Sequence, residues 1–245
     1  MMARLAQIRR HPVKGIGQEE IAATTLCPAR PLPLDRAWAV LTGEAGDTGQ
    51  WQPRRNFAQC AAAPRLMAVS ARMSGARITF SHPERPEITI DPDNDGAQLV
   101  AWIAPLCPAD RPAPTRLVRA PEQGMTDAPF ASVSLMSLAS LRAFSQEIGQ
   151  PLDPRRFRGN LWLDGSAPWA EFDWIGRTLR IGTAELEVVE RIERCRATEA
   201  SPVTGQRDAP TLRVLQDAWG HRDFGVNARV VTGGRIAVND PVEVL

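Results

Sequence analysis

The 245-residue sequence has few of the residues that build metal clusters. Three widely separated histidines do not suggest a metal triad, and nothing indicates a haem or a flavin. No CxxC pair occurs, which argues against a structural zinc site and against an iron–sulfur cluster. The four cysteines are isolated from one another, at positions Cys27, Cys60, Cys107 and Cys195.

Long apolar runs are also missing. No uncharged stretch approaches the roughly 18 residues that a membrane helix needs, and the N-terminal MMARLAQIRRHPVKG is too charged for a signal peptide. The formal net charge is +1, so the protein has no overall positive electrostatic potential that would favour binding to nucleic acid or to an anionic membrane. We therefore expect a cytoplasmic protein with reduced thiols and with neither a nucleic-acid nor a membrane partner.

Lysine is nearly absent. Of 29 basic residues only Lys14 is a lysine, in a chain with 21 prolines and no tyrosine. Where arginine is used throughout, a single lysine indicates a position that needs a compact ammonium group. Chance survival of one lysine in a biased composition is the alternative interpretation.

The hydrophobic pattern predicts a mainly β chain with a few short helices, an α+β fold. The proline-rich run 107–114 divides it into two predicted domains, 1–115 and 116–245. Short strands at near-regular spacing predict a small antiparallel barrel in the first. The expected strands cover 4–10, 34–41, 66–72, 77–81, 87–90, 161–163, 178–181, 184–194, 224–231, 235–238 and 242–245, and the expected helices 97–103, 137–149 and 211–219.

Cys195 follows the expected strand 184–194 and precedes a turn-rich loop, so we predict that it lies at an exposed strand end. Arg191, Arg194 and Arg196 flank it, and nearby positive charge favours the thiolate that acts as a nucleophile or a metal ligand. The alternative is a small apolar core residue, which is the commoner role of a single cysteine.

Other polar segments offer groups that suit an anion. The loop 13–17 contains glycines and Lys14, which combine free backbone N–H groups with a point charge. Ser134 and Ser137 stand at the start of the expected helix, another frequent anion site. In the segment 156–160, an extended backbone would project Arg156, Arg158 and Asn160 to one side as a cradle. A solvated, arginine-rich turn is the alternative for this last segment.

These residues resemble the signature of the MOSC family, found in molybdenum cofactor sulfurases and in the mitochondrial amidoxime-reducing component and its bacterial relatives. The similarity lies in Arg-Cys at 194–195, followed by Thr198, Pro202, Thr204-Gly205 and Asp208. His-Pro-Val-Lys-Gly at 11–15 is similar to the family's Tyr-Pro-Val-Lys-Ser, and Asp35-Arg36 and Arg-Phe-Arg-Gly-Asn at 156–160 resemble further family motifs. Two positions depart from the family pattern, Gly15 for serine and Asn227 for a frequent tyrosine.

The resemblance implies a small N-terminal β-barrel lobe packed on a C-terminal MOSC β-barrel. It implies the molybdenum cofactor (molybdenum–molybdopterin), with Cys195 as the metal ligand and Asp127 as a second catalytic residue. Asp35-Arg36 could instead be an ion pair that seals a barrel rim. The implied cofactor-binding residues are Lys14, Gly15, Arg36, Arg156, Arg158, Asn160, Arg194 and Thr198.

The activity implied is reduction of N-hydroxylated or N-oxygenated small molecules, with electrons from a separate donor protein because the sequence contains no ferredoxin-like cysteine run. One alternative is a carrier that delivers the molybdenum cofactor or persulfide sulfur without turnover of its own. The other is a binding or structural barrel with a vestigial site. A fold alone does not decide among them.

Overall fold

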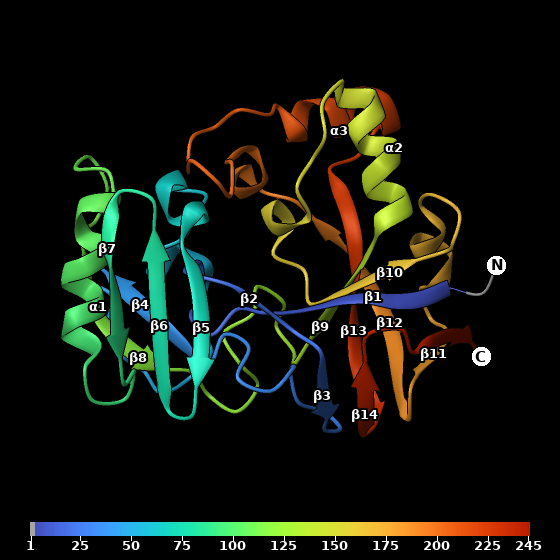
Figure 1. The fold of residues 1–245 in the computed structure, drawn as a ribbon, viewed down its shortest axis with the longest axis horizontal. Helices are drawn as coiled ribbons and strands as arrows, with labels where there is room; N and C mark the ends of the chain where they lie inside the picture. The colour runs from blue at the N-terminus through green and yellow to red at the C-terminus, as the bar shows by residue number, and fades with distance from the viewer. Residues whose placement is uncertain (1–2) are drawn as a thin grey trace.

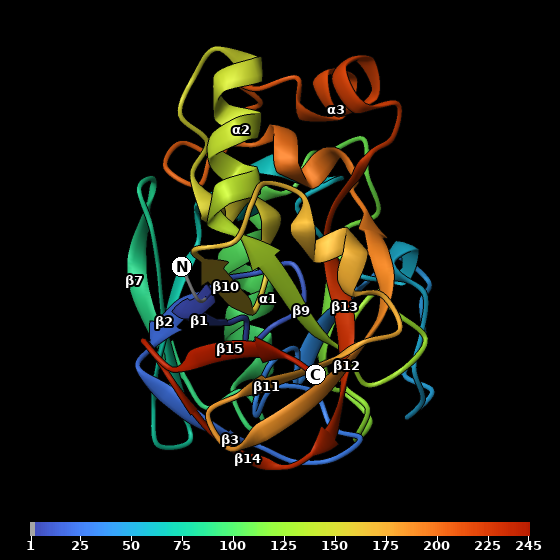
Figure 2. The same ribbon diagram turned by 90° about the vertical axis from the view of Figure 1, so that its right-hand side faces the viewer.

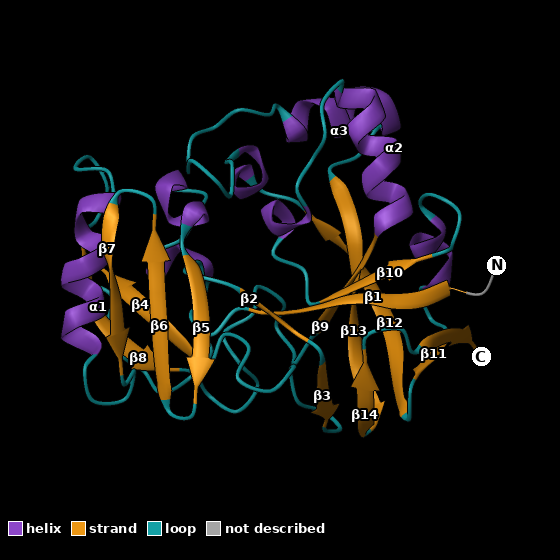
Figure 3. Ribbon diagram, in the orientation of Figure 1, coloured by secondary structure: helices purple, strands orange, loops and turns teal. Residues whose placement is uncertain are grey.

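The computed structural model describes residues 3–245 as two β-rich lobes that lie side by side along the long axis of the molecule (Figure 1). Short helices cover the outer ends of both lobes, as the colouring in Figure 3 shows. The predicted mainly β chain with a few short helices is confirmed. The predicted division at residues 115 and 116 falls within the strand β8 (Pro114–Arg119) and stays a prediction.

One lobe is a closed seven-stranded barrel. Hydrogen bonds join its strands in the order β10-β9-β13-β12-β11-β15-β1, and a further pairing of β10 with β1 closes the ring. The short strand β2 (Glu19–Ile21) is attached outside the ring to β1. The seven strands are β1 (Ala3–Arg10), β9 (Val133–Ser137), β10 (Leu161–Asp164), β11 (Thr178–Ile181), β12 (Ala184–Glu193), β13 (Asp223–Thr232) and β15 (Pro241–Val244).

The N-terminal strand β1 belongs to this barrel, where it pairs antiparallel with both β10 and β15. Leu5 and Ile8 of β1 are fully buried in a core shared with inward-facing residues such as Leu163 and Val226. Along the first half of β12, buried residues alternate with more exposed ones, which is the period of a half-buried sheet. The barrel interior is thus filled by aliphatic side chains.

The other lobe contains the three-stranded sheet β5-β6-β7 and the pair β4–β8, covered on its outer side by α1 (Gly96–Ile103) (Figure 1). Its strands are β4 (Trp38–Thr42), β5 (Ser70–Ser74), β6 (Arg77–His82) and β7 (Arg85–Ile90). A small pair of β3 (Ala23–Leu26) and β14 (Gly234–Ala237) joins early and late parts of the chain.

Two predicted strands begin later than expected. The segment 66–72 starts as a 3-10 helix at Pro64–Ala68, because Pro64 fixes a helical φ at its first position, and β5 begins only at Ser70. The segment 34–41 begins with turns, and β4 starts at Trp38. Leu34 and Arg36 both have positive φ, which is incompatible with a strand.

Two helices, α2 (Leu138–Ile148) and α3 (Thr211–Trp219), lie next to each other above one end of the barrel (Figure 2). The predicted end signals of α2 are confirmed: the Ser137 hydroxyl accepts from the Ser140 N–H at 3.2 Å, and Gly149 ends the helix in a left-handed conformation. Within residues 3–245 no helix is long and apolar enough to cross a membrane.

The anion site that the sequence suggested at the start of α2 stays a prediction, but its two serine hydroxyls have partners within the protein. Ser134 lies in β9, where its hydroxyl donates to the Asn160 side chain at 2.9 Å. The Ser137 hydroxyl caps its own helix. Both hydroxyl groups are therefore engaged within the protein.

Candidate functional site

A cavity of about 640 Å³ lies between the two lobes, and it is lined by all ten residues that were predicted to be catalytic or cofactor-binding. Its wall is formed by the loop after β1, by the segment 51–61 of the lobe that contains β4 to β8, and by the segment after β12. The ten residues come from five separate stretches of sequence: Lys14, Gly15, Arg36, Asp127, Arg156, Arg158, Asn160, Arg194, Cys195 and Thr198. The structure brings these residues together, and their individual roles stay predictions.

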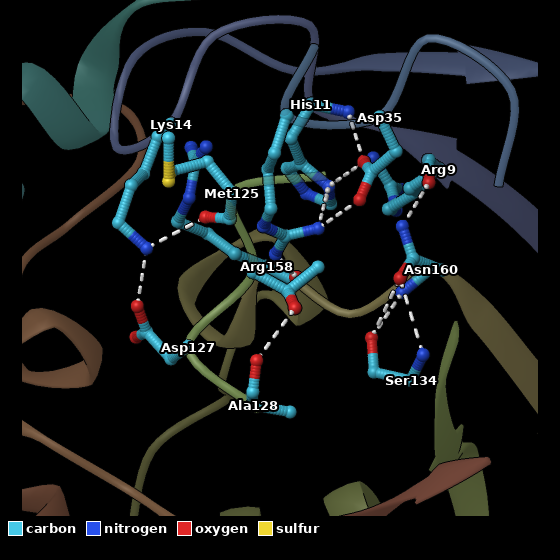
Figure 4. A network of polar contacts seen from close by, with 12 residues as sticks. Arg9, His11, Lys14, Asp35, Met125, Asp127, Ala128, Ser134, Arg158 and Asn160 are labelled. Atoms are coloured by element: carbon cyan, nitrogen blue, oxygen red, sulfur yellow. Dashed lines mark hydrogen bonds and ion pairs between the residues drawn. The ribbon is translucent and has the colours of Figure 1, made fainter. Parts of the chain in front are cut away.

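Lys14 is buried in the cavity wall, with only 5% of its surface exposed. Its ammonium donates to the Met125 carbonyl at 2.7 Å and forms an ion pair with the Asp127 carboxylate (Figure 4). Burial lowers the pKa of Lys14, and Asp127 opposes this. Desolvation raises the pKa of Asp127, but the charge and hydrogen bond of Lys14, together with the charges of Arg36 and Arg54, hold that pKa below its usual value. Asp127 is therefore ionised at neutral pH.

Gly15, next to Lys14, has no room for a side chain. Its φ is +71°, and a Cβ atom there would lie 2.6 Å from the Ala58 carbonyl oxygen and 2.8 Å from the Gln59 Cα. Backbone atoms cannot move away as a flexible side chain can. The backbone of the segment 58–60 lies so close to position 15 that it accommodates the glycine of this chain and not the serine of the family pattern.

We expect Gly15→Ala to destabilise the protein clearly more than Gly49→Ala. Gly49 also has a positive φ, +65°, but nothing lies within 4 Å of its Cβ position, so it isolates the conformational cost. That cost is about 1 kcal/mol or slightly more, and the clash at Gly15 adds roughly 1–3 kcal/mol. Urea unfolding of both variants measures the difference, and equal losses would contradict the steric explanation.

A buried cluster of His11, Asp35 and Arg36 lies behind the wall. Asp35 Oδ1 accepts from the His11 backbone N–H at 2.7 Å and lies 3.0 Å from His11 Nδ1, while Arg36 forms an ion pair with the other oxygen. Arg36 also donates to the Arg158 carbonyl at 2.8 Å. Burial raises the pKa of Asp35, but the Arg36 charge and the His11 donors bring it below its usual value. The predicted Asp35-Arg36 pair thus serves to hold Arg36 against the cavity.

His11 is held neutral. Burial, together with the charges of Arg36 and Arg158, lowers its pKa to about 3. Its Nε2 atom is buried without a hydrogen-bond partner within residues 3–245, so a proton placed there would be unpaired. Nδ1 is then the atom that donates to Asp35.

This histidine is expected to make stability depend on pH. An unfolded histidine titrates near 6.5, so below that pH the unfolded state binds a proton that folded His11 does not. The contribution of His11 to the free energy of unfolding is complete above pH 6.5. As the pH falls toward 3, the free energy of unfolding decreases by about 1.4 kcal/mol per pH unit. The buried His82, whose pKa is lowered by burial, contributes in the same direction.

The contribution of His11 is isolated by comparing urea unfolding of the wild type and His11→Asn between pH 7 and 5. Asparagine keeps a side-chain donor for Asp35 but does not titrate. We expect a smaller slope of unfolding free energy against pH in the variant. Identical slopes would show that His11 titrates in the folded protein as it does in the unfolded chain.

The segment 156–160 is not extended, which corrects the predicted cradle. Asp153 caps a 3-10 helix over Pro154–Phe157, and Arg158 is left-handed with φ 49°. Proline favours the first helical position and Asp153 accepts from the Arg155 N–H, so a helical turn forms here. The three polar side chains therefore leave the backbone in different directions, although all of them line the same cavity.

Each of the three has different partners. Arg156 forms a two-point ion pair with Asp208 at 2.6 and 2.9 Å, whereas its buried Nε has no partner within residues 3–245. Arg158 donates to the carbonyls of Gly17 and Val13 at 3.1 and 3.4 Å. Asn160 Oδ1 accepts from the Ser134 N–H and hydroxyl at 3.1 and 2.9 Å (Figure 4). Asn160 thus connects β9 to β10 as well as lining the cavity.

Cys195 lies two residues beyond the end of β12 and lines the cavity, where it is half-buried rather than exposed as predicted. Thr198 fixes the turn after it, because its hydroxyl lies 3.1 Å from the Cys195 carbonyl and 2.6 Å from the Thr211 hydroxyl. Thr198 itself is 1% exposed. We infer that Thr198 acts on the site by holding the Cys195 backbone.

The arginines around Cys195 have different surroundings. Arg194 lines the cavity, donates to the Phe157 carbonyl and lies 5.6 Å from the centre of the Phe157 ring, and burial lowers its pKa to about 10. Arg191 lies over the Phe172 ring and does not line the cavity, and Arg196 pairs with Glu199. Of the three, Arg194 and Arg196 line the cavity, and Arg194 is the half-buried one.

Sequence reasoning missed most of the contribution of the segment 51–61, of which it considered only Arg54 to Phe57, as a source of cationic contacts or as a solvated face. The segment also places Trp51 and Cys60 on the wall, and Ser132 and Arg222 were missed elsewhere. None of these residues has a distinctive local motif. Only the tertiary arrangement of the two lobes reveals them.

The wall is strongly cationic: eight of its residues are lysine or arginine and two, Asp127 and Glu193, are acidic. Such a surface suits an anionic ligand. Cys195 adds one soft donor for a metal. The residues present therefore fit an anionic group that carries a thiophilic metal, as a pterin phosphate with molybdenum does.

Comparison with known proteins gives two related chains. Mitochondrial amidoxime-reducing component 1 of Xenopus laevis is 25% identical over 258 aligned residues, which cover 85% of this chain and 71% of that protein. Molybdenum cofactor sulfurase of Caenorhabditis elegans is 32% identical over 156 residues, which cover 62% of this chain and 20% of the sulfurase. Among solved structures, the YUAD protein of Bacillus subtilis aligns over 100% of this chain and 96% of its own, with 12% identity and a TM-score of 0.49.

Two family models match successive parts of the sequence. The MOSC N-terminal beta barrel domain matches residues 2–103, and the MOSC domain matches residues 122–243. Together they cover nearly the whole chain, in the order that the resemblance implied. The chain belongs to the MOSC family.

Proposed function

We propose that this protein binds the molybdenum cofactor in the cavity between its lobes and reduces N-hydroxylated or N-oxygenated small molecules. The observation that carries the proposal is the convergence of ten residues, from five stretches of sequence, on one cationic cavity that contains Cys195. The relationship to an amidoxime-reducing component supports the reaction class. When bound, the cofactor would supply the two-electron chemistry that removes oxygen from nitrogen.

The chain's own residues would hold and orient this group. The exposed parts of Arg36 and Arg194 offer hydrogen bonds to its anionic and polar edges. The Cys195 thiolate would be the protein ligand of the metal. Because Asp35 and Phe157 already fix Arg36 and Arg194, these cations need little reorganisation on binding.

Asp127 is the candidate for contact with the substrate. Its side chain is 62% exposed and lines the cavity, and its ion pair with Lys14 keeps it ionised. An ionised carboxylate accepts hydrogen bonds and has no proton to give. We therefore assign Asp127 the role of orienting an N–H or O–H group of the substrate, with electrons coming from a separate donor protein.

The test is the molybdenum and pterin content of protein from a host that makes the cofactor, followed by reduction of a hydroxylamine-type substrate with a chemical electron donor. Near-stoichiometric cofactor together with turnover supports the proposal. Cofactor without turnover would favour the carrier alternative. A protein that takes up no cofactor even at saturation would exclude both the reductase and the cofactor carrier.

A further inference from the structure

Two of the eight cationic side chains on the cavity wall have no partner within residues 3–245. Four of the eight form ion pairs with carboxylates, and Arg158 and Arg194 donate to backbone carbonyls. The remaining two, Arg54 and Arg222, are exposed, and over the described part of the chain their guanidinium groups form neither an ion pair nor a hydrogen bond. Both groups can therefore bind a ligand without giving up an internal contact.

Arg54 belongs to a segment that is attached to the loop carrying Asp127. The Trp51 indole N–H donates to the Thr126 carbonyl at 2.9 Å, and the N–H of the residue after Trp51 donates to the Met125 sulfur at 3.5 Å. Arg54 and Asp127 both line the cavity. The backbone of Arg54 is thus fixed beside the candidate for substrate contact, while its side chain has no partner within residues 3–245.

Arg222 has a different position. Its backbone carbonyl accepts from the Arg194 N–H at 2.9 Å, next to Cys195, and it directly precedes β13 of the barrel. Arg54 comes from the other lobe, between β4 and β5. Arg222 therefore lies beside the candidate metal ligand, whereas Arg54 lies beside Asp127.

We propose that Arg54 binds an anionic group of the substrate, so that the preferred substrates are N-hydroxylated compounds that carry a carboxylate or a phosphate group. The inference rests on the proposed function, in which Asp127 accepts a hydrogen bond from the reacting end of the substrate. A guanidinium binds either anion through two parallel hydrogen bonds, which fix orientation as well as increase affinity. Arg54 is a specificity-determining residue and takes no part in the chemical step.

The place of Arg54 in a cavity separates it from an ordinary surface arginine. An ion pair on an open surface contributes little, because water screens it. A cavity lined by cations of one sign concentrates their field and attracts anions. Arg55, the next residue, is equally exposed but does not line the cavity. It is therefore the matched control for Arg54.

The test compares benzamidoxime with its 4-carboxylate and 4-phosphonate derivatives, reduced with a chemical electron donor by the wild type, Arg54→Gln and Arg55→Gln. We expect the wild type to prefer the anionic probes, and the probe with the larger preference identifies the anion. Arg54→Gln should lower the ratio of anionic to neutral kcat/KM by about tenfold or more, mainly through KM. Arg55→Gln should keep the wild-type ratio. Thermal unfolding checks that both variants fold.

Two results of this comparison would overturn the inference. The first is an equal ratio in Arg54→Gln and Arg55→Gln, which would show that the cavity position of Arg54 does not matter. The second is a loss of bound molybdenum and pterin in Arg54→Gln alone. Arg54 would then hold the cofactor and not the substrate.

A binding measurement separates this inference from the proposed function. The dissociation constant of 4-carbamoylbenzoate, which has no N–O bond to reduce, is measured by calorimetry with the same three proteins. We expect binding to weaken by about tenfold in Arg54→Gln and to stay unchanged in Arg55→Gln. If this result came from a protein that reduces none of the probes, only the reductase proposal would fail. Unchanged binding in Arg54→Gln, or a wild type that binds benzamide equally well, would refute the role of Arg54.

Discussion

Replacing Cys195 with serine is expected to lower reductase activity by more than about 100-fold, because loss of a residue that merely supports a metal ligand already costs 10–100-fold. A hydroxyl is a harder donor than a thiolate and is not deprotonated at neutral pH, so it cannot replace the soft ligand. Stability should change little, since Cys195 is only partly buried. Thermal unfolding and the metal spectrum of the loaded variant check both expectations.

The matched control for this variant is Cys27→Ser, because Cys27 is exposed and lies outside the cavity. It should retain wild-type activity and the wild-type metal spectrum. If Cys195→Ser reduced substrate as fast as Cys27→Ser, the metal ligand would have to be a different group. The assignment of Cys195 would then be withdrawn, whatever the cofactor content.

Asp35→Ala should have the largest effect on stability. The carboxylate is fully buried, and its removal leaves the His11 donors unsatisfied and Arg36 without its ion-pair partner. Breaking such a buried pair from one side costs about 3–5 kcal/mol. The change should also reduce cofactor occupancy, because Arg36 loses the contact that holds it against the cavity. Urea unfolding measures the first effect and molybdenum content the second.

Glu84→Ala removes an ion pair with Arg65 in which both side chains are at least 39% exposed, and it is the control. Exposed pairs contribute at most about 1 kcal/mol. A loss in Asp35→Ala no greater than that in Glu84→Ala would mean that the buried cluster adds little to stability. If Asp35→Ala showed the whole expected loss of unfolding free energy but bound the normal amount of cofactor, Arg36 would hold its position without Asp35.

Much of the fold could be predicted because its signals are local. Alternating polarity marks β12, and Ser137 and Gly149 mark the ends of α2. The errors occurred where a proline or a positive φ overrode the hydrophobic pattern, as at Pro64 and Arg36. The closure of the barrel by β1 has no local signal, since it depends on pairing between residues more than 150 positions apart.

The candidate site, like the fold, could be predicted only where its signals are local in the sequence. Residues within motifs, such as Lys14 and Cys195, could be named from the sequence, whereas their partners could not. Asp208 as the partner of Arg156 and Cys60 beside Gly15 follow only from the three-dimensional arrangement. The turn at 154–157 shows that equal spacing in sequence gives a common direction only when the backbone is extended.

The place of β1 in the barrel also has a consequence for biosynthesis. The first strand to leave the ribosome can pair early only with β2, over residues 8–10, because its other partners β10 and β15 are made much later. Until those strands emerge, β1 exposes free backbone groups along much of its length, which invites pairing with other chains. Its charged residues Arg4, Arg9 and Arg10 discourage such pairing while the nascent chain waits.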